Sequence, residues 1–343
     1  MRFGLFLNTP SAWQPRVRFE TTLEMAVRAQ AHGFDTVVVP QHYADTNQRL
    51  LQPLPMLGRL AAAVDTIRIG TGILLAGLLN PYEVAEGLAT VDVISGGRAL
   101  LGVGAGHQPN ELAAFGATMA ERGSRLEQCV TDVRTLWSMP TYGDLTPTVT
   151  APISLPPDPI PIWVAGTSDA GVRRAARIGD AWYVGPGADL ATIDRQTGVY
   201  AAELARWGRP MPAVLPIRRD VFLTTTRADR ARLADTLASR HAAQRASGYQ
   251  GDLPVAARTA RAGLVASGTG WAGLVGPEVI AGDGGECADQ LAALAGHLPA
   301  EPLVVLRVAW PAVEPAELLA QLDGIGDLTR QLATKGRSTT GKG

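Results

Sequence analysis

The chain contains 343 residues, of which 46% are hydrophobic and 18% are charged. This composition excludes a disordered chain and supplies enough apolar side chains for a large core. The formal net charge of −1 excludes a basic surface for nucleic acid or for anionic membranes. No apolar run reaches the roughly 18 residues of a membrane span, and the first residues resemble a strand rather than a leader, so we expect a cytoplasmic protein. The two cysteines, Cys129 and Cys287, are expected to be reduced core thiols.

Short apolar runs alternate with longer amphipathic stretches along the chain. The short runs, rich in Val, Ile and Leu, predict strands at Arg2–Leu7, Asp35–Val39, Ile67–Leu75, Ala99–Val103, Ile160–Ala165, Ala181–Val184, Val214–Leu223 and Leu303–Val308. The stretches with helical spacing predict helices at Arg16–His32, Tyr82–Ile94, Ala120–Ser138, Ser168–Ile178, Leu190–Trp207, Ala228–Arg245, Glu286–Leu298 and Glu314–Ala333. This repeated alternation predicts a single (β/α)8 TIM barrel over residues 1–335. An open doubly wound sheet is the alternative, but it usually has fewer units.

Two segments interrupt the alternation. Residues 141–159 are rich in Pro and Thr, which predicts a surface insertion before the fifth strand. Residues 247–285 are rich in Gly and predict a long insertion before the last strand. Loops of this length in a compact domain are usually functional lids or disordered segments. The small polar residues 336–343 predict a flexible tail.

The end of the fifth predicted strand has the pattern of an anion site. The strand runs into Gly166, and Thr167 and Ser168 then open a helix. Free N–H groups at a helix start, the positive end of the helix dipole and two hydroxyl groups together suit a phosphate. One of the two hydroxyl residues also serves as an ordinary helix cap in either interpretation. We therefore expect a phosphate site at this turn.

Histidines follow two of the predicted strands. His42 comes directly after the second strand and His107 follows the fourth. Reacting groups of such barrels lie at the carboxyl ends of the strands, and histidine is the usual proton carrier near neutral pH. The alternative interpretation of His42 is a hydrogen-bonded structural histidine at the rim of the pocket. No spacing of Cys, His or paired acidic residues predicts a protein-bound metal.

Glycines at the end of the fourth strand predict a close approach to the backbone. Gly102, Gly104 and Gly106 resemble a dinucleotide fingerprint, but His107 stands where its spacing would require the next small residue, so a flat ring lying on the backbone explains them better. A complete Gly-x-Gly-x-x-Gly at residues 268–273 lies in the Gly-rich segment with no convincing strand before it. We interpret that match as chance.

Motifs in the first half of the chain, taken in order, resemble those of the bacterial-luciferase-like, flavin-dependent monooxygenases. The matching segments are Gly33–Val39 with Gln41–Tyr43, Ile69–Ile73, Asn80–Pro81, Ala85–Glu86, Asp92–Arg98, Leu101–Gly106, Glu111, Ala114–Gly116, Pro161–Thr167 and Ala175–Trp182. The resemblance implies reduced FMN at the barrel mouth, O2 as co-substrate and a separate flavin reductase that supplies the FMN. It also implies a homodimer.

The resemblance assigns roles residue by residue. It places His42 and Gln41 as catalytic residues beside the reactive edge of the flavin, and a cis peptide bond at Gly72-Ile73 under the flavin ring. The other implied flavin contacts are Gly104, Ala105, Val164, Ala165, Gly166, Thr167 and Ser168. Two departures from the family pattern are that Ala105 stands where luciferase has an arginine and that Gln41 replaces a common glutamate.

The sequence therefore predicts an FMN-dependent monooxygenase that oxygenates a small hydrophobic or aromatic substrate. We expect Phe6, Leu75, Leu79, Trp182 and the loop around Trp271 to line its pocket. One alternative is a deazaflavin-dependent dehydrogenase or reductase on the same barrel, in which O2 takes no part. A second alternative is a flavin-binding relative that has lost catalysis.

Overall fold

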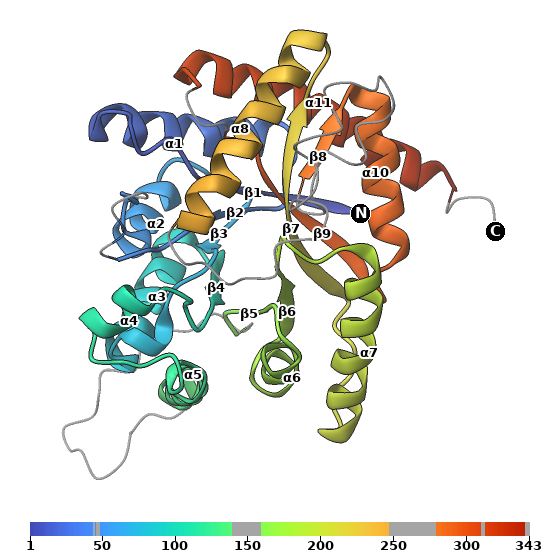
Figure 1. Cartoon of the computed structure of the whole chain (residues 1–343). Coiled ribbons are helices and arrows are strands. Elements are labelled where there is room, and N and C mark those ends of the chain that lie inside the picture. Colours follow the sequence, from blue (N-terminus) through green and yellow to red (C-terminus); the bar gives the residue numbers. More distant parts are fainter. Residues whose placement is uncertain (44, 46–48, 139–158, 247–278, 310–312, 340–343) are drawn as a thin grey trace.

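The protein forms a closed parallel β-barrel surrounded by helices (Figure 1). The structure is a computed structural model that describes residues 1–43, 45, 49–138, 159–246, 279–309 and 313–339. The strands of the barrel are β1 (Arg2–Phe6), β2 (Thr36–Val39), β3 (Arg68–Thr71), β4 (Ala99–Val103), β5 (Ile162–Gly166), β6 (Ala181–Val184), β7 (Val214–Leu223) and β9 (Glu301–Arg307). Each pairs in parallel with its neighbours, β9 pairs with β1, and a β6–β7 pairing closes the ring. The predicted (β/α)8 barrel is confirmed.

Helices cover the outside of the barrel (Figure 1). They are α1 (Pro15–Ala31), α2 (Pro53–Ala61), α3 (Pro81–Ser95), α4 (Pro109–Ala114), α5 (Arg122–Ser138), α6 (Asp169–Ile178), α7 (Leu190–Arg206), α8 (Arg227–Ala246), α10 (Gly284–Gly296) and α11 (Pro315–Thr339), with a 3-10 turn η1 (Ala76–Leu78). Within the described residues, no helix combines the length and the apolar character needed to cross a membrane. The sequence did not predict α2 and α4, which are short and begin with proline.

Two elements lie wholly or partly within segments that the sequence predicted as an insertion and as a tail. A further strand, β8 (Val279–Gly282), lies inside the predicted insertion 247–285. It pairs in parallel with the last four residues of β7, Asp220–Leu223. The apolar run Val279–Ala281 follows many glycines, which hid its strand character in the sequence. The last helix runs to Thr339, so it includes part of the predicted tail 336–343. Residues 247–278 of the first predicted segment and residues 340–343 of the tail lie outside the described residues. Residues 141–158 of the other predicted insertion lie outside them as well.

Alternation along the strands separates the barrel lumen from the outer layer. The indole of Trp182 in β6 faces outward, where its ring lies 5.7 Å from the ring of Tyr200 in α7. The next residue, Tyr183, faces the opposite way and contacts Trp163 of β5 at a ring distance of 5.7 Å. The lumen is therefore filled by side chains, as in other barrels of this size. Because the lumen is filled, a ligand has to bind at the rim.

A buried threonine joins β3 to β4 directly below the rim. The hydroxyl of Thr71 donates to the carbonyl of Gly102 at 2.6 Å and accepts from the amide of the same residue at 3.0 Å. The next residues continue this contact, since Leu74 N donates to Gly102 O and Gly104 N donates to Leu74 O. The backbone after β3 is thus fixed against the end of β4.

The two cysteines should be unreactive in the folded protein. Cys129 and Cys287 are free and buried, as predicted, and burial raises the pKa of each thiol to about 12. Both thiols therefore stay protonated at about pH 8, where an exposed cysteine is already a substantial nucleophile. A chromogenic disulfide reagent should titrate neither thiol in native buffer and both in denaturant. Rapid labelling of either thiol in the native protein would contradict this.

Candidate functional site

His42 and Glu111 form a hydrogen-bonded pair at the carboxyl-terminal rim of the barrel. His42 follows β2, and its Nδ1 lies 3.3 Å from Oε1 of Glu111 in α4. The Glu111 side chain is 1% exposed, whereas that of His42 is 17% exposed. The same Oε1 accepts from the backbone N–H of Tyr43 at 2.5 Å, and Oε2 has no partner among the described residues. A buried carboxylate thus orients an imidazole that remains accessible from the rim.

The charge of this carboxylate also affects its other neighbour. Burial and then the negative charge of Glu111 raise the pKa of the Tyr43 hydroxyl, so this group stays protonated near neutral pH. The ring of His107 stands edge-on to that of His42, with the ring centroids 5.8 Å apart. The structure therefore brings both rim histidines together.

Gln41 is surrounded by structural hydrogen bonds. Its side chain is 4% exposed, and its Nε2 donates to the Tyr43 hydroxyl at 2.8 Å and to Gln52 Oε1 at 3.0 Å. Its Oε1 accepts from Leu75 N at 2.9 Å. These contacts tie the loop after β2 to the loop after β3. Gln41 replaces a glutamate that is common in the family, and the carboxylate that contacts His42 here is that of Glu111.

The peptide bond between Gly72 and Ile73 is cis, as the family resemblance implied. The side chain of Ile73 lies against Gly104, where an added Cβ would meet Ile73 Cδ1 at 2.6 Å and Ala165 Cβ at 3.7 Å. The ends of β3, β4 and β5 are therefore in contact at this point. Ala105 and Ala165 remain partly exposed there, so only small side chains stand between Ile73 and the β5 turn.

Small residues and hydrogen bonds from neighbouring elements fix the backbone of the turn after β5. A Cβ at Gly166 would lie 2.5 Å from the carbonyl carbon of Gly171, so only glycine fits this approach. The carbonyl oxygens of the turn are already used, since Trp182 Nε1 donates to Gly166 O at 2.9 Å and Gln196 Nε2 donates to Thr167 O at 2.8 Å. Val164 is fully buried below the turn.

The Ser168 side chain caps α6, accepting from Gly171 N at 3.2 Å. The cap interpretation of this residue is thus confirmed. Asp169 is acidic and stands in the first turn of α6, where Arg195 forms an ion pair with it at 2.7 Å. The hydrogen bond from Arg195 holds the pKa of Asp169 below its usual range. An anion at this turn would therefore bind next to a paired carboxylate.

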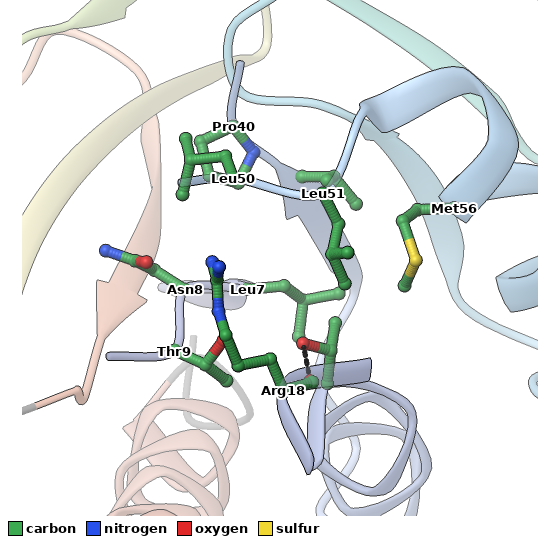
Figure 2. A pocket seen from close by; sticks show the side chains of 10 residues that line it. Leu7, Asn8, Thr9, Arg18, Pro40, Leu50, Leu51 and Met56 are labelled. Carbon is green, nitrogen blue, oxygen red and sulfur yellow. Dashed lines mark hydrogen bonds between the residues drawn. The ribbon is translucent and has the colours of Figure 1, made fainter. Parts of the chain in front are cut away.

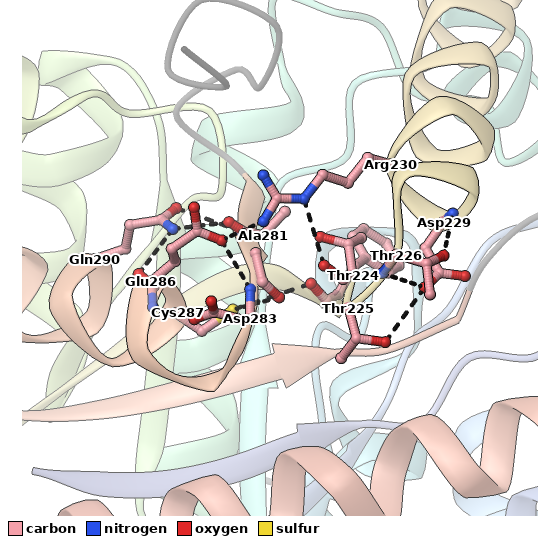
Figure 3. A network of polar contacts seen from close by, with 12 residues as sticks. Thr224, Thr225, Thr226, Asp229, Arg230, Ala281, Asp283, Glu286, Cys287 and Gln290 are labelled. Carbon is pink, nitrogen blue, oxygen red and sulfur yellow. Dashed lines mark hydrogen bonds and ion pairs between the residues drawn. The ribbon is translucent and has the colours of Figure 1, made fainter.

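A second helix start on the rim, that of α10, is already capped by acidic side chains (Figure 3). Asp283 and Glu286 form a reciprocal capping box there, with Glu286 N donating to Asp283 Oδ1 and Asp283 N donating to Glu286 Oε2, both at 2.9 Å. Arg230 of α8 forms an ion pair with the Glu286 carboxylate at 2.7 Å. Because these N–H groups already have anionic partners, the α6 turn suits an added phosphate better.

Two hollows elsewhere are unsuited to a cofactor. One, beside the ends of β1 and β2, measures about 10 Å³, which holds about one water, and the buried Arg18 is among its lining residues (Figure 2). The guanidinium of Arg18 donates to the carbonyl of Arg49. Burial lowers the pKa of this arginine. A larger hollow, of about 610 Å³, lies at the carboxyl-terminal ends of α5 and α6, away from the rim that carries His42. It is lined by Ser138 and Ile178, the last residues of these two helices.

A small apolar cluster, called the apolar wall below, is buried on the His42 side of the rim, and its outer residues are partly exposed. It consists of Leu75, Leu78, Leu112 and Ala117, with Tyr43, Ile73 and Phe115 packed against them. The Tyr43 and Phe115 rings are 4.6 Å apart. Of the expected lining residues, Leu75 belongs to this wall and Phe6 lies at the end of β1. The expectation for Trp182 was wrong, because its indole faces the helices, and Trp271 lies outside the described residues.

Sequence reasoning did not assign a role to Glu111. This glutamate was part of the family pattern, but it lies 69 residues from His42 along the chain, so spacing gave no sign of their contact. The only local signal was a glutamate in the first turn of a short helix after a histidine-bearing loop.

The fold and this rim define a (β/α)8 barrel whose polar chemistry is gathered at the carboxyl ends of its strands, the usual position of a barrel active site. The chain belongs to the luciferase-like monooxygenase family, whose model matches residues 1–300.

The chain is also similar to curated relatives that are named as F420-dependent dehydrogenases. The F420-dependent glucose-6-phosphate dehydrogenase of Segniliparus rotundus is 33% identical over 183 residues, which are 50% of this chain and 55% of that protein. The protein of the same name from Amycolatopsis mediterranei is 31% identical over 183 residues, again 50% and 55% of the two chains. The chain thus spans about half the length of these curated relatives.

Solved structures share the fold over nearly the whole chain. Monooxygenase RslO1 from Streptomyces bottropensis has a TM-score of 0.76 at 22% identity and covers 95% of this chain and 98% of its own. An F420-dependent secondary alcohol dehydrogenase in complex with an F420-acetone adduct has a TM-score of 0.72 at 20% identity, with 95% and 97% covered. The oxygenating constituent of 3,6-diketocamphane monooxygenase from Pseudomonas putida, in complex with FMN, has a TM-score of 0.74 at 17% identity, with 95% and 97% covered.

Proposed function

We propose that this chain is an FMN-dependent monooxygenase. It uses reduced FMN, supplied by a separate flavin reductase, and O2 to oxygenate a small substrate with a hydrophobic or aromatic body. The observation that carries the proposal is the imidazole of His42, which the buried Glu111 holds beside an apolar wall. An oriented proton carrier next to a surface that excludes water is what such a reaction requires of the protein.

The rim residues fit a flavin. Gly104, Ala105 and Ala165 leave a surface of small residues beside Ile73 that a planar ring can cover, and a larger residue at Gly104 would displace Ile73. The glycine turn at Gly166 would hold the ribityl phosphate through N–H groups at the start of α6. When bound, reduced FMN supplies the reaction with O2.

His42 is the proposed proton carrier. Carboxylate oxygens only accept hydrogen bonds, so Glu111 fixes the proton of the neutral imidazole on Nδ1 and leaves Nε2 to exchange a proton at the rim. The hydrogen bond to Glu111 also keeps the imidazole in the same orientation when Nε2 takes a proton. Gln41 has a positioning role in this proposal, since its amide joins the loops that carry His42 and Leu75.

Hydride transfer to or from deazaflavin F420 is the second candidate. The observation that favours it is the identity of 31–33% to F420-dependent glucose-6-phosphate dehydrogenases. A sugar carries a hydroxyl on nearly every carbon, however, and the partly exposed side chains of Ile73 and Phe115 at this wall offer such a substrate no hydrogen bonds. The wall therefore suits a less polar substrate.

Cofactor titration and O2 uptake separate the two candidates. FMN and F420 are each titrated into the full chain, and their fluorescence is followed. Chemically reduced FMN is then mixed with the protein and O2 in the presence of a panel of aromatic acceptors. We expect FMN to bind and 18O from labelled O2 to appear in an acceptor. Binding of F420 alone, with reduction of F420 by an alcohol and no oxygen incorporation, would replace the proposal by the second candidate.

Replacing Gly104 with alanine should weaken flavin binding while the fold persists. The added methyl group would lie 2.6 Å from Ile73 Cδ1, so the Ile73 side chain has to shift at the surface where we propose that the flavin ring lies. Overpacking of this kind costs about 1–3 kcal/mol, so FMN affinity should fall about tenfold or more. Gly58→Ala in α2 is the control, because nothing lies within 4 Å of the added carbon. Equal FMN affinity in both variants would place the ring elsewhere.

A further inference from the structure

The inner face of β7 presents an arginine at the barrel rim. Arg219 points outward, where its guanidinium donates to the carbonyl oxygens of Pro186 and Ala188 in the loop after β6. Its neighbour Arg218 points inward because side chains alternate along a strand. The guanidinium carbon of Arg218 lies 4.9 Å from the ring centroid of Phe6 in β1. Since β9 separates β7 from β1 in the sheet (Figure 1), this contact is made across the lumen.

Register places Arg218 at the height of the rim. Ile217 pairs with Val184, the last residue of β6, so Arg218 lies just beyond the end of that strand. Two residues further along, Asp220 pairs with Arg307, the last residue of β9. Phe6 is the last residue of β1 and pairs with Val38 of β2, the strand that leads to His42. Arg218 thus belongs to the same end of the barrel as the proposed active site.

Two hydrogen-bond donors in this part of the lumen have no partner among the described residues. Arg218 Nε is buried without an acceptor, and so is the hydroxyl of Tyr183, whose residue is only 4% exposed. The two groups are close enough for the charge of Arg218 to oppose the rise that burial causes in the pKa of Tyr183. Buried donors in native proteins are usually paired, so such a pair of donors indicates an acceptor that binds there.

The local charge is positive. Asp220 is fully buried and forms an ion pair with Arg307, so these two charges cancel. Arg218 forms no ion pair with a described residue, and its guanidinium lies over the ring of Phe6. A guanidinium stacked on an aromatic ring keeps its edge free for a planar two-oxygen acceptor, which it binds with two parallel hydrogen bonds.

We propose that Arg218, with the hydroxyl of Tyr183, forms a subsite for an anionic group of the substrate, a carboxylate or a similar oxyanion. The substrate of this site is then amphipathic: its apolar body lies toward Phe6 and the wall beside His42, and its charged end lies against β7. This rests on the proposed function only in assuming that the substrate occupies the same rim as the cofactor.

Benzoate and benzamide test the proposal, because they share shape and differ in charge. Each is titrated by calorimetry into the full chain, with and without saturating FMN. We expect benzoate to bind on the order of tenfold to a hundredfold more tightly than benzamide, the size of a hydrogen bond to a charged group. The variant Arg218→Met should bind both equally. Arg218→Lys should keep part of the preference, because an ammonium is a charge without the planar fork.

Controls separate this subsite from a structural role and from the cofactor site. Arg206→Met removes an exposed arginine at the far end of α7 and should leave the preference unchanged. Arg218→Met loses the contact with the Phe6 ring but no ion pair with a described residue, so its Tm should fall only slightly. The proposal is overturned if the native chain shows no preference for benzoate, if Arg218→Met keeps that preference, or if this variant loses FMN affinity instead. A benzoate preference in a chain that fails to bind FMN would support this subsite while contradicting the proposed function.

Discussion

Replacing His42 with alanine is expected to lower kcat by about 100-fold to 10,000-fold, the usual contribution of a positioned general acid or base. FMN affinity should change little, because the surface at Gly104 and the turn at Gly166 are untouched. Oxygen-dependent product formation under saturating reduced FMN is the measurement. If His42 were only a structural histidine of the rim, the alanine variant would lose stability and FMN affinity while its kcat persisted.

Two companion variants sharpen this test. Glu111→Gln keeps an oxygen that can accept from Tyr43 N and His42 Nδ1 but removes the negative charge, so kcat should fall by a smaller factor than in His42→Ala. His107→Ala removes a neighbouring ring of the same chemistry, 5.8 Å from that of His42, and serves as the matched control. A loss in His107→Ala as large as that in His42→Ala would transfer the proton-carrying role to His107.

The strands and the long helices could be predicted because each depends on local periodicity. Continuous Val and Ile runs such as Val37–Val39 are typical of strands that are covered on both faces, and every strand of the barrel was expected within a few residues. Helix α4 was missed because its six residues are too few to show an amphipathic period. Strand β8 was missed because it directly follows the Gly-rich segment.

The pairings that define the site could not be predicted in the same way. His42 and Glu111 are 69 residues apart, and Asp220 and Arg307 are 87 residues apart. Only the closed barrel brings these residues together, since the carboxyl ends of all its strands meet at one rim. The sequence placed His42 at that rim, and the family resemblance added Gln41 as a second catalytic residue, but neither indicated the contact with Glu111. Gln41 instead has its amide in structural hydrogen bonds.

Removing one partner of the buried ion pair between Asp220 and Arg307 should cost more stability than any other single substitution among the rim residues. Asp220 is fully buried, and the Arg307 side chain is 14% exposed. Asp220→Leu would leave the Arg307 guanidinium without its carboxylate beside a second arginine, Arg218. Breaking a buried pair in this way typically costs about 3–5 kcal/mol of the free energy of unfolding. Denaturant titration followed by circular dichroism would measure it.

The double variant Asp220→Leu with Arg307→Met decides how this cost arises. Both substituted side chains are apolar and of similar length to those they replace, so no buried charge is left over and most of the lost stability should return. The same double variant keeps Arg218, and therefore it should also keep the preference for benzoate over benzamide. Removing both partners leaves no unpaired buried charge. If the double variant is nevertheless as unstable as the single one, the lost stability comes from the hydrogen bonds of the pair and not from an unpaired charge.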